Sequence, residues 1–194
     1  MRIIALDFET GGTDPQRHGP VSLGLAVMDG DTVTATFETL IGPKLNKKGF
    51  PEKEYDVTAL SISGIKWPDI KKAPQPVDVW RAATEFVQDN KARSLTVVSH
   101  NASFDQAFWS QLRFMAGHFD KATYTFSMPS EILEGPWICT RRMASRMNLK
   151  DETLDTVAGS LGLSRSSELH GALEDAILAG NTFAKLAAME QATA

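Results

Sequence analysis

The chain has 194 residues, of which 42% are hydrophobic and 23% are charged, and its formal net charge is −4. We therefore expect one globular domain that spans residues 1–194. The negative net charge argues against a protein that holds long duplexes by neutralising their phosphates. No apolar run approaches the length of a membrane span, so we expect no contact with a membrane. Cys139 is the only cysteine, which rules out an intrachain disulfide and fits a cytoplasmic location.

The first predicted element is a buried strand over residues 3–10 that ends at two glycines. Because side chains alternate along a strand, Asp7 and Glu9 project from the same face. Two like charges about 4 Å apart repel by roughly 4 kcal/mol at a protein-like dielectric constant, and Mg²⁺ or Mn²⁺ would relieve that repulsion. The alternative is that the strand ends at Leu6 and that both acids are solvated in a turn.

Two β-rich runs follow at 21–28 and 32–41, and the Asp29-Gly30-Asp31 sequence between them predicts a hairpin that pairs with the first strand. Residues 42–56 are rich in Lys, Gly and Pro and predict a loop. Lysines outnumber acids over 44–72, which indicates either a phosphate-facing flap or a solvated loop.

The rest of the chain alternates between helical and strand patterns. A short helix is predicted over 58–63, then a helix that begins near Pro76 and a strand over 95–98. The next helix carries Phe104, Phe108, Leu112 and Met115 on one stripe, and an irregular segment over 117–135 and a strand over 137–139 follow it. The last predicted elements are a basic helix with Arg141, Arg142 and Arg146, a helix over 154–161, a loop over 164–169 and a helix over 172–189.

This order of elements predicts an α/β fold in which a mixed five-stranded sheet is flanked by helices. Functional sites in such sheets lie near the carboxyl ends of parallel strands. The pair Asp7 and Glu9 lies at one such end, and residues 101–105 follow another. Asp105 is expected in the first turn of a helix that Ser103 or Asn101 would cap, where an acid either complements the helix dipole or joins a site.

His170 and Asp175 are five residues apart, which on a helix amounts to about 500° of rotation and separates their side chains around the axis. They converge only if His170 lies in a loop or cap while Asp175 lies on the helix. We interpret the other histidines, His18, His100 and His118, as structural or surface residues.

Three segments together resemble the motifs of the DEDDh exonucleases, a superfamily that includes DnaQ-like proofreading subunits, RNase T, oligoribonuclease and exonuclease X. These segments are Asp7-Phe8-Glu9-Thr10, Asn101-Ala102-Ser103-Phe104-Asp105 and His170-Gly171-Ala172-Leu173-Glu174-Asp175. Residues 99–105 and 136–140 resemble exonuclease X in particular. The resemblance implies an RNase H-like fold and hydrolysis from a 3′ end that releases nucleoside 5′-monophosphates.

The resemblance also implies roles for individual residues. Two Mg²⁺ or Mn²⁺ ions about 3.5–4 Å apart would activate an attacking water and steady the departing 3′ oxygen, with His170 as the general base. The expected metal ligands are Asp7, Glu9, Asp105 and Asp175, and the expected substrate contacts are Thr10, Gly11 and Asn101. Ser63 occupies a place where many relatives carry a histidine, and the Lys-rich insertion before it is longer than usual, so contacts with the terminal nucleotide are expected to differ.

We expect single-stranded DNA with a 3′ end as the substrate, because an acidic chain with a narrow metal cleft cannot exploit a long duplex. Phe50, Tyr55 and Trp67 are candidate stacking residues. The alternatives are an exoribonuclease that acts on short RNA, a non-catalytic nucleic-acid-binding module and a mononucleotide phosphatase. The chain ends soon after its last predicted helix, which favours a free-standing enzyme over a polymerase-bound subunit. Homodimer formation is left open.

Overall fold

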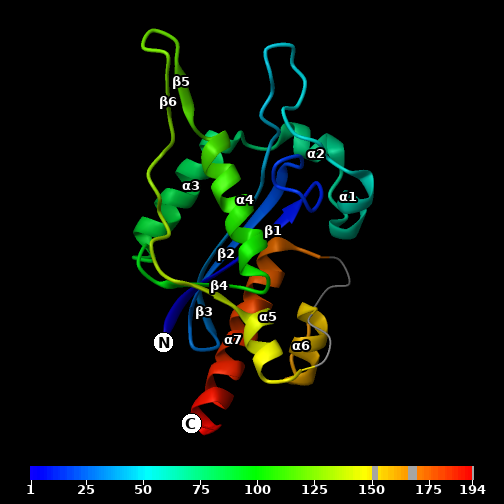
Figure 1. Cartoon of the computed structure of the whole chain (residues 1–194), viewed down its shortest axis with the longest axis vertical. Coiled ribbons are helices and arrows are strands. Elements are labelled where there is room, and N and C mark those ends of the chain that lie inside the picture. Colours follow the sequence, from blue (N-terminus) through cyan, green and yellow to red (C-terminus); the bar gives the residue numbers. More distant parts are fainter. Residues whose placement is uncertain (150–152, 166–169, 194) are drawn as a thin grey trace.

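The computed structural model describes residues 1–149, 153–165 and 170–193. Its centre is a five-stranded sheet with the order β3-β2-β1-β4-β7, which confirms the predicted mixed sheet (Figure 1). The pairs β1–β2 and β2–β3 are antiparallel, and the pairs β1–β4 and β4–β7 are parallel. The strands of this sheet are β1 (Arg2–Thr10), β2 (Pro20–Asp29), β3 (Thr32–Leu40), β4 (Thr96–Ser99) and β7 (Trp137–Cys139).

The middle of the sheet is formed by β1 and β2. Residues 3–6 of β1 and nearly all residues of β2 are buried, because helices cover both faces. The turn from β2 to β3 uses Gly30 with φ of 63°, a left-handed conformation that favours glycine. The predicted hairpin is therefore confirmed. β1 lies between β2 and β4. Because β1 and β4 are parallel, their carboxyl ends lie at the same end of the sheet.

Each face of the sheet carries a layer of helices (Figure 1). Side chains of α3 and α4 pack against the face that bears Ile4 and Leu6. Side chains of α5, α6 and α7 pack against the other face, which bears Ile3 and Ala5. The helices are α1 (Val57–Ser63), α2 (Trp67–Lys72), α3 (Pro76–Asp89), α4 (Ala102–Met115), α5 (Thr140–Arg146), α6 (Leu154–Ser160) and α7 (Ala172–Thr193). Among the described residues, no helix is both long and apolar enough to cross a membrane.

Some elements differ from the expectation. The segment 117–135 was expected to be irregular, but it contains a second, two-stranded sheet of β5 (His118–Asp120) and β6 (Thr125–Ser127). These strands are too short and too exposed to show the alternation by which strands are predicted. The sequence reading also missed α2, a six-residue helix that is too short for helical periodicity. Of the predicted loop over 164–169, residues 166–169 lie outside the described part of the chain.

Candidate active site

The carboxyl end of β1 extends beyond its parallel neighbour. β4 pairs only with residues Ile3, Ile4 and Ala5, whereas β1 continues to Thr10. Since Ile3 and Ala5 face α7, the alternation of the strand directs Asp7 and Glu9 towards the same face. The expectation that β1 carries both acids is confirmed, and the alternative of a strand that ends at Leu6 is wrong.

Asp105 fills the gap that the short β4 leaves beside β1. Its Oδ1 atom accepts a hydrogen bond from the Phe8 N–H at 3.2 Å, and its Oδ2 atom accepts one from Ser99 Oγ at 2.6 Å. The side chain is buried although it lies in the first turn of α4. Asn101 is the N-cap residue, but its side chain makes no capping hydrogen bond. Asp105 is therefore buried against β1. An acid that only complements the helix dipole could stay exposed, so this position favours a role in the site.

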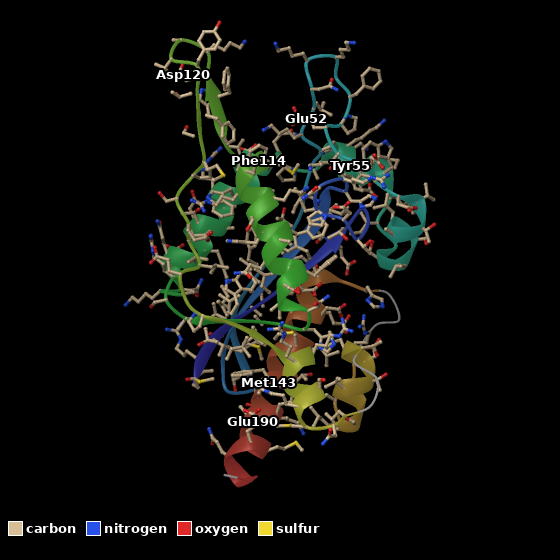
Figure 2. The ribbon with its side chains drawn as sticks, in the orientation of Figure 1. Glu52, Tyr55, Phe114, Asp120, Met143 and Glu190 are labelled. Atoms are coloured by element: carbon tan, nitrogen blue, oxygen red, sulfur yellow. The ribbon has the colours of Figure 1, made fainter. Side chains whose placement is uncertain are left out.

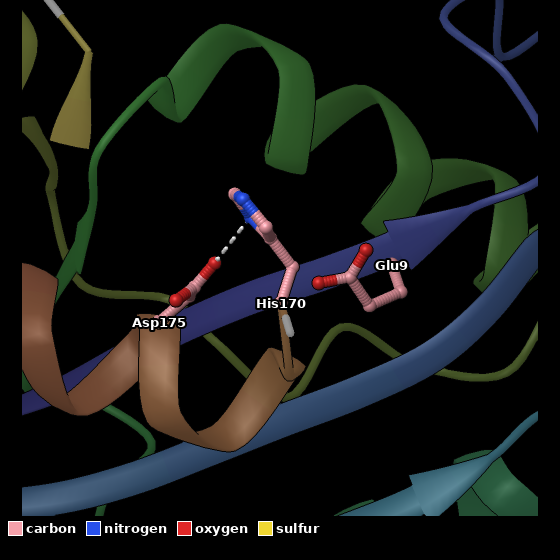
Figure 3. Close-up of side chains that lie close together, drawn as sticks. All are labelled: Glu9, His170 and Asp175. Carbon is pink, nitrogen blue, oxygen red and sulfur yellow. Dashed lines mark ion pairs between the residues drawn. The ribbon is translucent and has the colours of Figure 1, made fainter. Parts of the chain in front are cut away.

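His170 and Asp175 converge as their spacing required. His170 precedes the first residue of α7, and Asp175 lies in the first turn of that helix. The His170 Nδ1 atom lies 3.2 Å from Asp175 Oδ2. Figure 3 shows the His170 ring turned towards Asp175, with Glu9 close by, and ligand atoms of the three residues lie within 4.8 Å of one another. Residues from β1, α4 and α7 thus meet at one edge of the sheet.

Burial raises the pKa values of the clustered acids. The pKa of Asp7 lies well above its usual value because the side chain is desolvated and because Asp105, Asp175 and Glu9 are close. Burial raises the pKa of Glu9 to about 7, and Asp175 adds to the effect. Burial also raises the pKa of Asp105 to about 7, although its hydrogen bonds from Ser99 and Phe8 act in the opposite direction. These acids cannot all be charged at low cost unless cations are close.

Arg165 is a candidate residue that the sequence analysis missed. Its Nη1 atom lies 3.0 Å from Asp175 Oδ1, and its Nε atom donates a hydrogen bond to Asp155 Oδ1 at 2.7 Å. The Arg165 charge lowers the pKa values of Asp7, Glu9 and Asp175, against the effect of burial. In the sequence Arg165 is an isolated basic residue in a predicted loop, and no local pattern distinguishes it from a solvated one.

Two of the expected substrate contacts, Thr10 and Gly11, follow directly after Glu9, whereas Asn101 is the N-cap residue of α4. Thr10 Oγ1 donates a hydrogen bond to the Gly12 carbonyl at 2.8 Å. The Gly11 N–H donates to the Gly19 carbonyl, and the Gly11 carbonyl accepts from Asp56, so both backbone groups are already engaged. Ser63 lines a cavity of about 440 Å³ together with Glu9 and His170, among other residues. That position fits the place assigned to Ser63 beside the site.

Two of the three candidate stacking residues, Tyr55 and Trp67, are half-buried. The rings of Tyr55 and Trp67 lie 5.1 Å apart and pack against a small buried cluster that includes Leu60 and Ile70. Phe50, in contrast, is exposed in the Lys-rich loop. Phe50 is therefore the most accessible of the three rings for stacking on a nucleic-acid base.

The family model for exonucleases that is named after RNase T matches residues 4–183. The chain belongs to this exonuclease family. The match covers all three motifs, and it confirms that the chain is an exonuclease of this family.

Curated relatives of this exonuclease chain are bacterial DNA polymerase components. It is 27% identical over 187 residues to a DNA polymerase III of the PolC type from Thermotoga maritima, a match that covers 96% of this chain and 12% of the relative. It is 26% identical over 187 residues to a DNA polymerase III epsilon subunit from Aquifex aeolicus, covering 94% of this chain and 79% of the relative. The chain thus spans about an eighth of the PolC-type relatives it matches.

Solved exonuclease structures share the fold. The nuclease domain of 3′hExo, described as a DEDDh family member bound to rAMP, aligns with a TM-score of 0.67 and 14% identity over 99% of this chain and 92% of that domain. Exonuclease X in complex with 5′ overhanging duplex DNA aligns with a TM-score of 0.64 and 19% identity over 97% of this chain and 93% of that one. These likenesses confirm the RNase H-like architecture.

Exonucleases of the DEDDh type depend on divalent metal ions, and the residues of this chain fit such ions. Carboxylate oxygens and an imidazole nitrogen converge, and these are suitable ligands for Mg²⁺ or Mn²⁺. Asp175 Oδ1 is also buried without a hydrogen-bond partner, although it pairs electrostatically with Arg165. The donor set is therefore suited to cation binding.

Proposed function

We propose that this chain is a metal-dependent 3′–5′ exonuclease that hydrolyses phosphodiester bonds from the 3′ end of nucleic acid and releases nucleoside 5′-monophosphates. The observation that carries the proposal is the convergence of Glu9, His170 and Asp175. Asp7 and Asp105 lie beside them: burial and the charges of Asp105, Asp175 and Glu9 raise the pKa of Asp7, and Asp105 also contributes to the raised pKa of Glu9. Family membership supports the same reaction.

Asp7, Glu9, Asp105 and Asp175 would hold the metal ions, which we propose to be two Mg²⁺ or Mn²⁺ ions. When bound, the ions supply Lewis-acid stabilisation of the negative charge on the phosphate. The partial burial of the acids excludes bulk water and so strengthens their electrostatic effect.

His170 would act as the general base. Its Nδ1 atom faces Asp175 Oδ2 at 3.2 Å, which leaves Nε2 to accept the proton of the attacking water. The water oxygen would then bond to phosphorus, and the bond from phosphorus to the 3′ oxygen of the preceding nucleotide would break, with that oxygen taking a proton from solvent and leaving as a 3′ hydroxyl. Asp175 stabilises the imidazolium that forms. With 40% of its side chain exposed, His170 is able to reach a substrate.

Single-stranded DNA is the proposed substrate. The net charge of −4 disfavours a large duplex interface, and the curated relatives are named as parts of DNA polymerases. Short RNA is the second candidate, because a domain of the same fold was solved with rAMP. A non-catalytic binding module would not need all five motif residues, and this chain has them all.

The decisive experiment follows 5′-labelled single-stranded DNA, duplex DNA and RNA with and without Mn²⁺. We expect stepwise shortening from the 3′ end that requires metal and is fastest on single-stranded DNA. Asp105→Asn should abolish it, whereas Asp89→Asn, at an exposed position at the end of α3, should not. Failure of the wild-type protein to shorten any of these with Mn²⁺ would contradict the proposal.

A further inference from the structure

The exposed aromatic side chains of this protein all lie at one end of the molecule. Among the described residues, the largely exposed aromatic side chains come from the loop before α1, the last turn of α4 and the β5–β6 hairpin; they are Phe50, Phe114, Phe119, Tyr124 and Phe126. Figure 1 shows that the loop (cyan) and the hairpin project from the same end of the body. Scattered exposed rings need no explanation, but several exposed rings gathered at one end of a molecule indicate an interaction surface.

The Lys-rich loop has a defined structure. Asn46 holds its turn through backbone hydrogen bonds with Gly49 and Phe50, and its Oδ1 atom accepts from the Lys48 and Phe50 N–H groups. Lys47, Lys48 and Phe50 are exposed at the tip, with the Phe50 side chain 64% exposed. Between residues 44 and 53 there are four lysines and one acid, Glu52, so the loop is basic on an acidic chain.

The β5–β6 hairpin and the Lys-rich loop both contact Phe114 at the end of α4. The Phe126 ring lies 4.9 Å from the Phe114 ring, and Lys44 Nζ lies 5.8 Å above the Phe114 ring. Figure 2 shows Phe114 between the hairpin and the loop. At the hairpin tip the side chain of Tyr124 is 84% exposed. We call the combination of loop 44–53, Phe114 and hairpin 118–127 the distal surface.

An exposed stripe of α4 runs from the first turn of the helix, the turn that also carries the buried Asp105, to the distal surface. The stripe begins at Ser103, continues through Gln106 and Ser110 and ends at Phe114, and this spacing keeps these residues on one side of the helix. Asp105 lies nine residues before Phe114, which corresponds to about 13–14 Å along the helix. At about 3.4 Å per stacked nucleotide, this distance is about four nucleotides. A terminal nucleotide alone would not reach the distal surface.

We propose that the distal surface binds the part of a single-stranded nucleic acid that lies upstream of its 3′ end. This inference rests on the proposed exonuclease function. Lys47 and Lys48 would contact phosphates, and the exposed rings would stack on bases, the combination by which proteins hold single strands without sequence preference. Glu52 and Asp120 are the acids within these segments, so the positive charge is concentrated at the loop tip.

Binding is measured by fluorescence anisotropy of a labelled 20-nucleotide oligothymidylate in EDTA, which prevents hydrolysis. Lys47→Ser/Lys48→Ser removes the tip charges, and Phe50→Ser/Tyr124→Ser removes a ring from each projection. Lys185→Ser and Val77→Ser, at exposed positions on α7 and α3, are the matched controls. We expect about 5- to 100-fold weaker binding for each base that loses its stacking ring. The lysine variant should reduce the slope of log affinity against log salt by about 1.4.

Hydrolysis is compared on the same oligonucleotide and on p-nitrophenyl thymidine 5′-monophosphate, a phosphodiester too small to reach the distal surface. The ratio of kcat/KM for the long substrate to that for the ester should fall at least fivefold in both double variants and should stay constant in the controls. If the double variants bind the oligonucleotide as tightly as the controls, the proposal is overturned and a protein becomes the better candidate occupant. If the wild-type protein hydrolyses neither substrate, the proposed function fails while the binding result still tests the surface.

Discussion

Gly24 and Ala172 are in such close contact that no other residue fits at position 24. A Cβ atom on Gly24 would lie 2.3 Å from the carbonyl carbon of Ala172, the first residue of α7. Gly24 is also the cross-strand partner of Asp7 on β2. The start of α7 therefore rests directly on the strand beside Asp7, and this contact brings His170 and Asp175 to the acids of β1.

The first prediction is that Gly24→Ala displaces the start of α7. Because the clash is with backbone atoms, it cannot be relieved by a side-chain rotation, and we expect a loss of about 1–3 kcal/mol in the free energy of unfolding. The activity should fall further, to about a hundredth, since misplacement of catalytic groups by about 1 Å has this effect. Urea denaturation and kcat on a labelled oligonucleotide measure the two changes.

A matched control is Gly159→Ala in α6, where a Cβ would meet no atom within 4 Å. That variant should gain roughly 0.5–1 kcal/mol in the free energy of unfolding and keep its activity. If Gly24→Ala matches it in both measurements, the close packing of α7 on β2 does not position the site.

The second prediction concerns Arg165, which lies 3.0 Å from Asp175. Without metal, its guanidinium is the positive charge that offsets Asp7, Glu9 and Asp175 together, and Arg165→Met would leave Asp175 with His170 as its remaining partner. We expect the metal-free protein to lose about 1–3 kcal/mol in the free energy of unfolding. Saturating Mn²⁺ should reduce this loss, because the metal ion replaces the positive charge. Arg142→Met, at an exposed position on α5, is the control. An equal loss with and without Mn²⁺ would be inconsistent with this account.

Much of the fold follows from local patterns. The buried run of β1, the turn at Gly30 and the stripe of apolar residues on α4 are each visible within a short segment, so the sheet and its main helices could be predicted. The acids of the site could be predicted because Asp7 and Glu9 are two residues apart on a strand and so share one face. The spacing of His170 and Asp175 also restricts where the two side chains can meet.

Other features depend on contacts between distant segments. Arg165 is recognised only from its ion pairs with Asp155 and Asp175, each ten residues away. In the sequence, Gly24 is only a glycine within a strand, and its close contact with the start of α7 is visible only in the folded structure. The β5–β6 hairpin is exposed and short, so its residues carry no pattern of burial. Contacts between distant segments leave no periodic pattern in the sequence from which they could be predicted.

The third prediction is a pH dependence of stability in the metal-free protein. The pKa values of Glu9 and Asp105 are raised to about 7 in the folded state, so between about pH 4.5 and 7 the folded protein binds more protons than the unfolded chain. These acids therefore lower the free energy of unfolding as the pH rises through that range. Urea denaturation in EDTA at several pH values measures the slope, which should be shallower in Asp105→Asn. An identical slope in that variant would show that Asp105 does not contribute. Saturating Mn²⁺ should flatten the slope of the wild-type protein, because the ions favour the ionised acids.

The last prediction separates two roles that the geometry allows for His170. Its nitrogen lies within 4.8 Å of ligand atoms of Glu9 and Asp175, which is compatible with a metal ligand as well as with a general base. If His170 is the base, His170→Ala should lower kcat by about 10²–10⁴-fold and leave the Mn²⁺ affinity within a few fold of wild type. Added imidazole should restore part of the activity, because the side chain of His170 is 40% exposed and a small base can take its place. Calorimetric titration with Mn²⁺ and rate measurements with imidazole test both points. A large loss of Mn²⁺ affinity without rescue by imidazole would instead make His170 a metal ligand, and the proton of the attacking water would then need another acceptor.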